Sequence, residues 1–141
     1  MHSEQLMRTY LEDVAVSGRL ELIDELAHED MVDEANRAFG GPMGRAGLVA
    51  HVEGFHRHIR DVEVTIERII GNDESVMAWW RFTGVHAGPW LGRAPTGERI
   101  EATVFSFFDL VAGRISRYRL WLHAGFEEPA IFDTSTAPDI A

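Results

Sequence analysis

The chain has 141 residues, of which 45% are hydrophobic, with no cysteine and a formal net charge of −10 at pH 7. This length suits one domain with a substantial core, expected over residues 1–127, and residues 128–141 read as a C-terminal tail. The negative charge argues against nucleic acid and membrane surfaces as partners. The lack of cysteine excludes disulfides and cysteine-ligated metal sites. No apolar leader or membrane-spanning run is visible, so we expect a cytoplasmic protein.

The N-terminal part is helical in pattern. A first helix is predicted from Ser3, a candidate N-cap, to a break at Gly18, because its apolar residues recur every 3.6 positions. A second helix is predicted around Leu20–Leu26, and a short strand over Met31–Asn36. The third helix, over Leu48–Ile59, has the clearest apolar stripe.

Three histidines lie on the third predicted helix, namely His51, His56 and His58. None has a second histidine at the i, i+4 spacing that directs two imidazoles toward one metal ion. We therefore interpret them as surface residues, and expect neither a metal nor another cofactor.

The second half of the chain changes to a period of two, which is typical of strands. Four strands are predicted, the first beginning at Asp61 and the others over Val76–His86, Glu98–Leu110 and Arg114–Phe126. Five glycines and prolines between residues 88 and 97 predict a long loop after the second strand. Helices followed by an antiparallel meander predict an α+β fold, with the helices on one face of a curved sheet.

Several glycine-containing motifs have a distinctive spacing along the strands. The segment from Phe82 to Gly88, FTGVHAG, is followed by Gly92, by the tripeptide 95–97 (PTG) and by the tripeptide 113–115 (GRI). With these motifs the chain resembles the SnoaL-like polyketide cyclases, which belong to the NTF2-like superfamily with ketosteroid isomerase, scytalone dehydratase and limonene epoxide hydrolase. The resemblance implies an NTF2-like cone, in which three N-terminal helices pack on a strongly curved antiparallel sheet around one deep cavity. It also points to a homodimer.

The resemblance assigns positions to the family's polar pocket residues. The family's acid/base aspartate corresponds to His123 here, counted from the turn at Gly113. Its usual tryptophan on the same strand falls on Arg119, and its usual histidine near the short strand falls on Glu34. The resemblance therefore implies a cyclase-type pocket that is altered at three positions.

Strand alternation gives a list of pocket residues that does not depend on the family. Steps of two from His86, from Ile100 and from Ile115 select one face of each strand. A cavity between these faces would combine aromatic walls with a few polar groups, which is typical of a site for a hydrophobic small molecule. The predicted substrate-binding residues are Trp80, Phe82, Trp90, Ser106, Arg119, Trp121 and Glu34.

Two histidines are the predicted catalytic residues. We expect His123 to be the general acid/base and His86 to orient or polarise a substrate carbonyl, because imidazole takes and gives a proton near neutral pH. The alternative for this pair is a purely structural hydrogen bond in a polar pocket.

An arginine on an inward face needs a carboxylate, because burial of an unpaired guanidinium is costly. Glu34 is the expected partner of Arg119, with Asp33 and Glu101 as the other candidates. Such an ion pair would be structural or would bind substrate.

Three functions fit these residues. The first is a cofactor-independent enzyme that transfers a proton on a hydrophobic carbonyl compound, as a cyclase, isomerase or dehydratase. The second is a small-molecule binding or carrier protein with the same cavity, and the third is a protein–protein adaptor, which the inward polar groups disfavour. The strand faces that point away from the predicted pocket are apolar, which is unusual on a soluble monomer, so they predict a homodimer formed through the outside of the sheet. They carry Met77, Trp79, Phe105 and Phe107.

Overall fold

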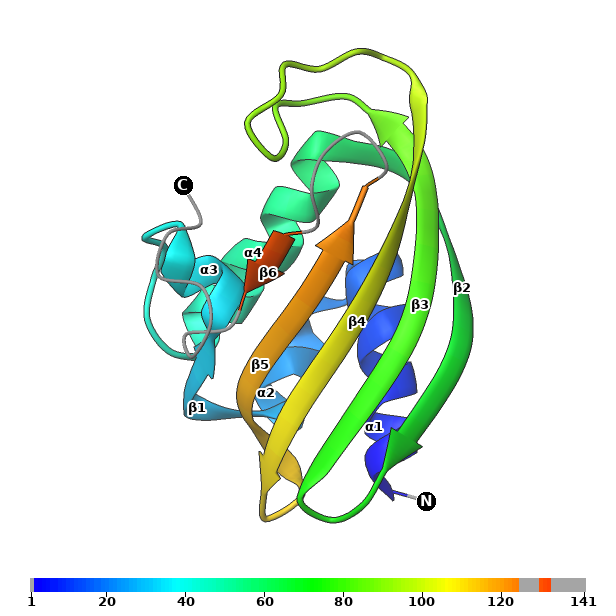
Figure 1. The fold of residues 1–141 in the computed structure, drawn as a ribbon. Coiled ribbons are helices and arrows are strands. Elements are labelled where there is room, and N and C mark those ends of the chain that lie inside the picture. Colours follow the sequence, from blue (N-terminus) through cyan, green and yellow to red (C-terminus); the bar gives the residue numbers. More distant parts are fainter. Residues whose placement is uncertain (1, 125–129, 133–141) are drawn as a thin grey trace.

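The computed structural model describes residues 2–124 and 130–132, and shows helices gathered on one face of a long, curved sheet (Figure 1). The helical segments are α1 (His2–Thr9), its π-helical continuation η1 (Tyr10–Val16), the 3₁₀ turn η2 (Leu20–Leu22), α2 (Ile23–Leu26), α3 (Glu34–Ala38) and α4 (Arg45–His58). The strands are β1 (Ala27–Asp33), β2 (Ile59–Gly71), β3 (Ser75–His86), β4 (Arg99–Val111), β5 (Arg114–His123) and β6 (Ala130–Phe132). The predicted α+β class is confirmed.

The sheet has the strand order β1-β5-β4-β3-β2, in which β2 to β5 form the predicted antiparallel meander. β1 runs parallel to the first part of β5, and β6 pairs antiparallel with its last part at Leu120–Leu122. Residues 130–132, which were expected in the tail, therefore extend the sheet. The remaining tail prediction, for Thr134–Ala141, falls outside the described residues.

The end of β1 differs from the sequence prediction. The strand ends at Asp33, whose carboxylate accepts a hydrogen bond from the Asn36 backbone N–H at 3.0 Å. This N-cap satisfies a backbone donor that a helix start leaves without a partner, and so favours the short helix α3. Five residues are too few to show a helical stripe, so the pattern did not reveal α3.

β5 contains a β-bulge at Ser116. Leu110 of β4 lies opposite Ile115, but its neighbour Asp109 lies opposite Arg117. The additional residue exchanges the two faces of β5, because side chains along a strand alternate. The predicted parity of this strand is therefore wrong from residue 117 onward. The structure directs Tyr118, Leu120 and Leu122 toward the helices, and Arg119, Trp121 and His123 away from them.

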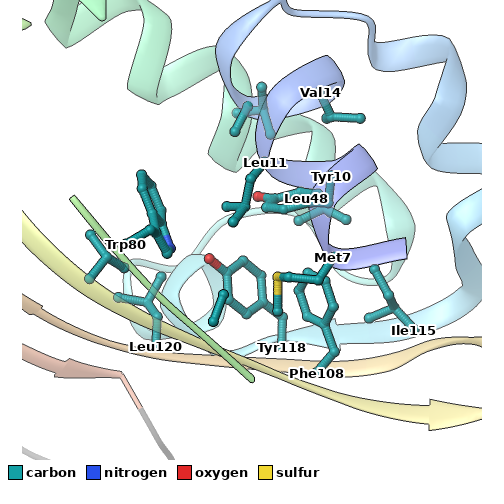
Figure 2. Close-up of a cluster of buried hydrophobic side chains, with 14 of the residues drawn as sticks. Met7, Tyr10, Leu11, Val14, Leu48, Trp80, Phe108, Ile115, Tyr118 and Leu120 are labelled. Atoms are coloured by element: carbon teal, nitrogen blue, oxygen red, sulfur yellow. The ribbon is translucent and has the colours of Figure 1, made fainter. Parts of the chain in front are cut away.

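The core lies between the first helix and the inner face of the sheet (Figure 2). Tyr10 packs edge-on against Phe108 and Tyr118, with ring centroids 5.3 and 5.7 Å apart, while Met7 and Leu11 are completely buried beside it. Such edge-to-face pairs stabilise beyond the area they bury. This packing fixes the rings of both tyrosines, whose hydroxyl groups are described below.

The outer face of the sheet is aromatic, and its predicted composition is confirmed. Trp79 stacks on Phe105 with centroids 6.0 Å apart, although the two residues remain 43% and 37% exposed. Met77 is 37% exposed on the same face, and Arg81 pairs with Glu101 at 3.2 Å beside it. In the part of the chain that is described, no helix has the length and apolar character needed to cross a membrane.

Candidate functional site

A cavity of about 380 Å³ lies between the helices and the inner face of the sheet. Its volume is within the range of sites for small organic molecules. The apolar wall includes Phe55, Phe82, Pro89, Trp90, Leu91, Val104, Leu120 and Leu122. The lining residues with polar groups are Tyr10, Asn36, His51, His58, Trp80 and Tyr118.

His51 on α4 and Asp33 at the end of β1 form a dyad at this cavity. The His51 Nδ1 atom lies 2.7 Å from Asp33 Oδ2, and the Asp33 side chain is only 1% exposed. Because the other carboxylate oxygen caps α3, the aspartate is held by two independent contacts. A neutral His51 must then donate from Nδ1 to the carboxylate, which leaves the Nε2 lone pair available as a base.

The surroundings of His51 act on its pKa in opposite directions. Burial works to lower the pKa, but the charge of Asp33 and the hydrogen bond to it outweigh burial, so the pKa of His51 is raised. The His51 ring also stacks on Tyr118, with centroids 5.7 Å apart and planes inclined by 19°. The His51 imidazole therefore lies directly beside a phenol.

A chain of hydrogen bonds connects Trp80, Ser106 and Tyr118 on the inner face of the sheet. The Trp80 Nε1–H donates to Ser106 Oγ at 3.0 Å, and that oxygen lies 2.8 Å from Tyr118 Oη. The Tyr10 ring packs edge-on against Tyr118 beside this chain. Because Ser106 Oγ accepts the hydrogen bond from Trp80 and can donate its own proton to Tyr118, the Tyr118 proton is available to a ligand in the cavity.

Burial raises the pKa of both tyrosines far above the ordinary value. For Tyr118 burial is the largest cause, opposed by the hydrogen bond from Ser106 and supported by the Asp33 charge. For Tyr10 burial is again the largest cause, followed by the charge of Tyr118. Both phenols consequently remain protonated donors near neutral pH.

Of the residues predicted to bind substrate, Trp80, Phe82 and Trp90 line the cavity. Trp90 belongs to the loop after β3, and its ring lies edge-on to Phe82 at 5.9 Å. Ser106 faces inward but is completely buried beneath Trp80 and Tyr118, so it supports the wall without being part of it.

The predicted ion pair has the expected carboxylate but a different arginine. Glu34 is buried and pairs with Arg117 at 2.7 Å, whereas Arg119 binds both oxygens of Asp109 at 2.7 and 2.8 Å on the outer face. Register along β5 is the physical reason: Arg117 pairs with Val32 at the end of β1, next to Glu34, whereas Arg119 lies one pleat further on, beyond the end of β1.

The two predicted catalytic histidines do not meet in the cavity. His123 is exposed and lies opposite Thr103 on the outer face, beside Trp121, so its predicted inward orientation is wrong for the same reason as that of Arg119. His86 faces inward and is 1% exposed, but it does not line the cavity. Its Nδ1 lies 3.4 Å from Thr96 Oγ1, so it anchors the returning end of the loop.

The sequence interpretation missed His51, Asp33 and Tyr118. A signal for the last was present, because apolar residues at 118, 120 and 122 are out of step with Ile115 and so indicate a bulge. His51 lies three positions after Leu48, on the buried side of its helix, so the expectation that it is a surface residue is wrong.

Among residues 2–124 and 130–132, no three histidine, aspartate or glutamate side chains cluster as metal ligands would. The polar groups at the cavity instead include the hydrogen-bonded pair His51–Asp33 and the hydroxyl group of Tyr118.

Comparison with solved structures shows the same fold in proteins of low sequence identity. TsrD from Streptomyces laurentii superposes with a TM-score of 0.73 at 19% identity, covering 86% of this chain and 87% of that one. IdmH from Streptomyces antibioticus, a proposed polyketide cyclase, superposes with a TM-score of 0.69 at 23% identity, covering 89% of this chain and 93% of that one. An LEH-like epoxide hydrolase from M. tuberculosis superposes with a TM-score of 0.62 at 19% identity, covering 86% of this chain and 83% of that one.

No curated protein sequence matches the chain significantly. The family model of SnoaL-like polyketide cyclases, however, matches residues 5–123, which include every strand of the meander and all the helices described above except the first three residues of α1. The chain therefore belongs to the SnoaL-like polyketide cyclase family.

Proposed function

We propose that this protein is a cofactor-independent enzyme that transfers a proton on a hydrophobic carbonyl compound. One observation carries the proposal: the His51–Asp33 dyad, 2.7 Å between nitrogen and oxygen, opens onto an aromatic cavity beside the phenol of Tyr118. The family name and the comparison with IdmH agree with chemistry of the cyclase type.

His51 is the proposed acid/base. Its Nε2 removes a proton from the carbon next to the substrate carbonyl, the electrons of that C–H bond form a C=C bond to the carbonyl carbon, and the carbonyl π electrons move to the oxygen, which gives an enolate. Asp33 stabilises the imidazolium that forms, because its carboxylate accepts the Nδ1–H and carries the opposite charge.

Tyr118 is the proposed donor to the developing enolate oxygen. A fixed donor in a dry cavity stabilises such a charge more than water does, because it needs no reorganisation during the reaction. The hydrogen bond to Ser106 and the edge-on packing of the Tyr10 ring hold the phenol in place. Attack of the enolate on a second carbonyl closes a ring, its reprotonation elsewhere gives an isomer, and loss of a hydroxyl group gives dehydration.

The test is the exchange of α-protons of a bicyclic aryl ketone such as 1-tetralone in deuterated water, followed by NMR. His51→Gln should lower the exchange rate by roughly 10²–10⁴-fold, because the group that carries the proton is lost. His123→Gln is the matched control. It should keep the wild-type rate, because His123 lies on the outer face.

Each outcome separates the candidate functions. Equal rates in wild type and His51→Gln would place the chemistry elsewhere, and loss of exchange in His123→Gln would restore the prediction made from the sequence. If the wild type binds the ketone and exchanges no proton, the protein is a carrier with the same cavity.

We also propose that the protein forms a homodimer through the outer face of the sheet. The stacked pair Trp79–Phe105 and Met77 remain partly exposed there, and so large an apolar area is unusual on the surface of a monomer. A second copy would cover it symmetrically.

A further inference from the structure

Two histidines of α4 line the cavity, and the proposed chemistry uses only one of them. His51 and His58 are seven positions apart, which is about two helical turns and about 10 Å along the helix axis. They therefore lie on the same side of α4. Along the wall that this helix contributes to the cavity, His51 lies toward one end and His58 toward the other.

The loop after β3 fixes the His58 ring. The backbone N–H groups of Ala87 and Gly88 donate to the His58 carbonyl oxygen at 2.8 and 3.0 Å. A Cβ atom added to Gly88 would lie only 2.6 Å from His58 Nδ1, so the turn packs directly on this edge of the ring. Within the described residues Nδ1 is buried without a hydrogen-bond partner. Nε2, at the opposite edge, is thus the nitrogen that can reach a ligand.

The charge state of His58 suits recognition of a neutral oxygen. Burial lowers the pKa of His58, and the nearby charges of Arg57 and His86 lower it further. The ring is therefore neutral near pH 7, and a neutral imidazole can donate or accept a hydrogen bond. No carboxylate of the described residues is hydrogen-bonded to it, in contrast to His51, so it lacks the partner that would support a catalytic base.

A shared metal ion does not explain the pair. Two imidazoles that bind one zinc ion must each bring a nitrogen within about 2.1 Å of it, which a separation of about 10 Å along the helix prevents. Between the two histidines the wall is apolar, and Phe55 and Phe82 meet edge-on at 5.0 Å. The cavity thus has two polar ends joined by an aromatic wall.

We propose that His58 is a specificity-determining residue, which recognises a second oxygen of the substrate about 10 Å from the carbonyl that reacts at His51. The ligand class is an elongated, flat ketone with a hydroxyl or carbonyl group at its far end. The position of the reacting end rests on the proposed function, and the position of the far end rests on His58 alone.

The test compares two linearly fused tricyclic ketones that differ only in a hydroxyl group on the ring opposite the carbonyl. Dissociation constants are measured by quenching of tryptophan fluorescence, since Trp80 and Trp90 line the cavity. The wild type should bind the hydroxylated ketone about 3- to 10-fold more tightly, the effect of one neutral hydrogen bond. His58→Leu should remove the preference without weakening the other ketone, and His58→Gln should retain part of it. His56→Gln, on the same helix but outside the lining, should keep the full preference.

A wild type without a preference, or a His58→Leu variant that retains it, would overturn the proposal. If His58→Leu does not fold, the imidazole ¹⁵N shifts of the wild type decide: His58 should respond to the hydroxylated ketone and much less to the other. Equal responses would also overturn it. Because only binding is measured, a protein that discriminates the ketones but exchanges no proton would keep this role of His58 and lose the proposed enzymatic function.

Discussion

The two ion pairs of β5 make a quantitative prediction about two arginines that are two positions apart. Arg117 pairs at 2.7 Å with Glu34, whose side chain is only 1% exposed. Arg119 pairs with Asp109 at 2.7 Å, but their side chains are 22% and 34% exposed. Leucine at either position removes the positive charge but still packs like the aliphatic part of arginine. The two substitutions therefore differ mainly in which carboxylate loses its partner, Glu34 or Asp109.

Loss of one partner from a buried ion pair costs about 3–5 kcal/mol, because the other charge stays in the interior. Arg37 lies 3.8 Å from Glu34 and supplies a second cation, so we expect the lower end, about 3 kcal/mol, for Arg117→Leu. Arg119→Leu should cost about 1 kcal/mol or less, because water can solvate Asp109.

Urea unfolding followed by tryptophan fluorescence measures both variants. With a typical slope of about 1–3 kcal/mol/M, a loss of about 3 kcal/mol lowers the midpoint by about 1–3 M. Repeating the measurement at two protein concentrations separates any effect on association, since dissociation makes the midpoint depend on concentration. A larger loss for Arg119→Leu than for Arg117→Leu would refute the assignment of the buried Glu34 to Arg117.

Two further predictions concern the dyad and the outer face. Asp33→Asn should lower the pKa of His51 in an NMR titration, because the carboxylate charge that opposes burial is gone. The raised pKa of His51 stabilises the folded wild type below the unfolded value of about 6.5, and this contribution is lost as the pH rises through the folded value, so Asp33→Asn should destabilise more at pH 5.5 than at pH 9. An equal loss at both pH values would contradict the pairing. Trp79→Glu should convert the proposed dimer to the 15.9 kDa monomer in light scattering, and a wild type that already has the monomer mass would remove the dimer proposal.

The sequence alone determined the order of the elements apart from α3 and β6, and the two faces of β3 and β4. Trp80 and Phe82 face inward and Trp79 outward, as alternation predicts, because hydrophobic periodicity is a local property of a regular strand. The three main helices followed in the same way from their apolar stripes. Cavity residues on the regular strands β3 and β4 were therefore predictable.

The tertiary structure decided the residues that give the cavity its chemistry. His51 and Asp33 are 18 positions apart and meet only because β1 packs against α4, which no local pattern contains. On β5 a single additional residue, Ser116, places Tyr118 in the cavity and His123 outside it. Alternation assumes an unbroken ladder of hydrogen bonds, and where the ladder is broken the face of each following side chain depends on how the whole sheet pairs.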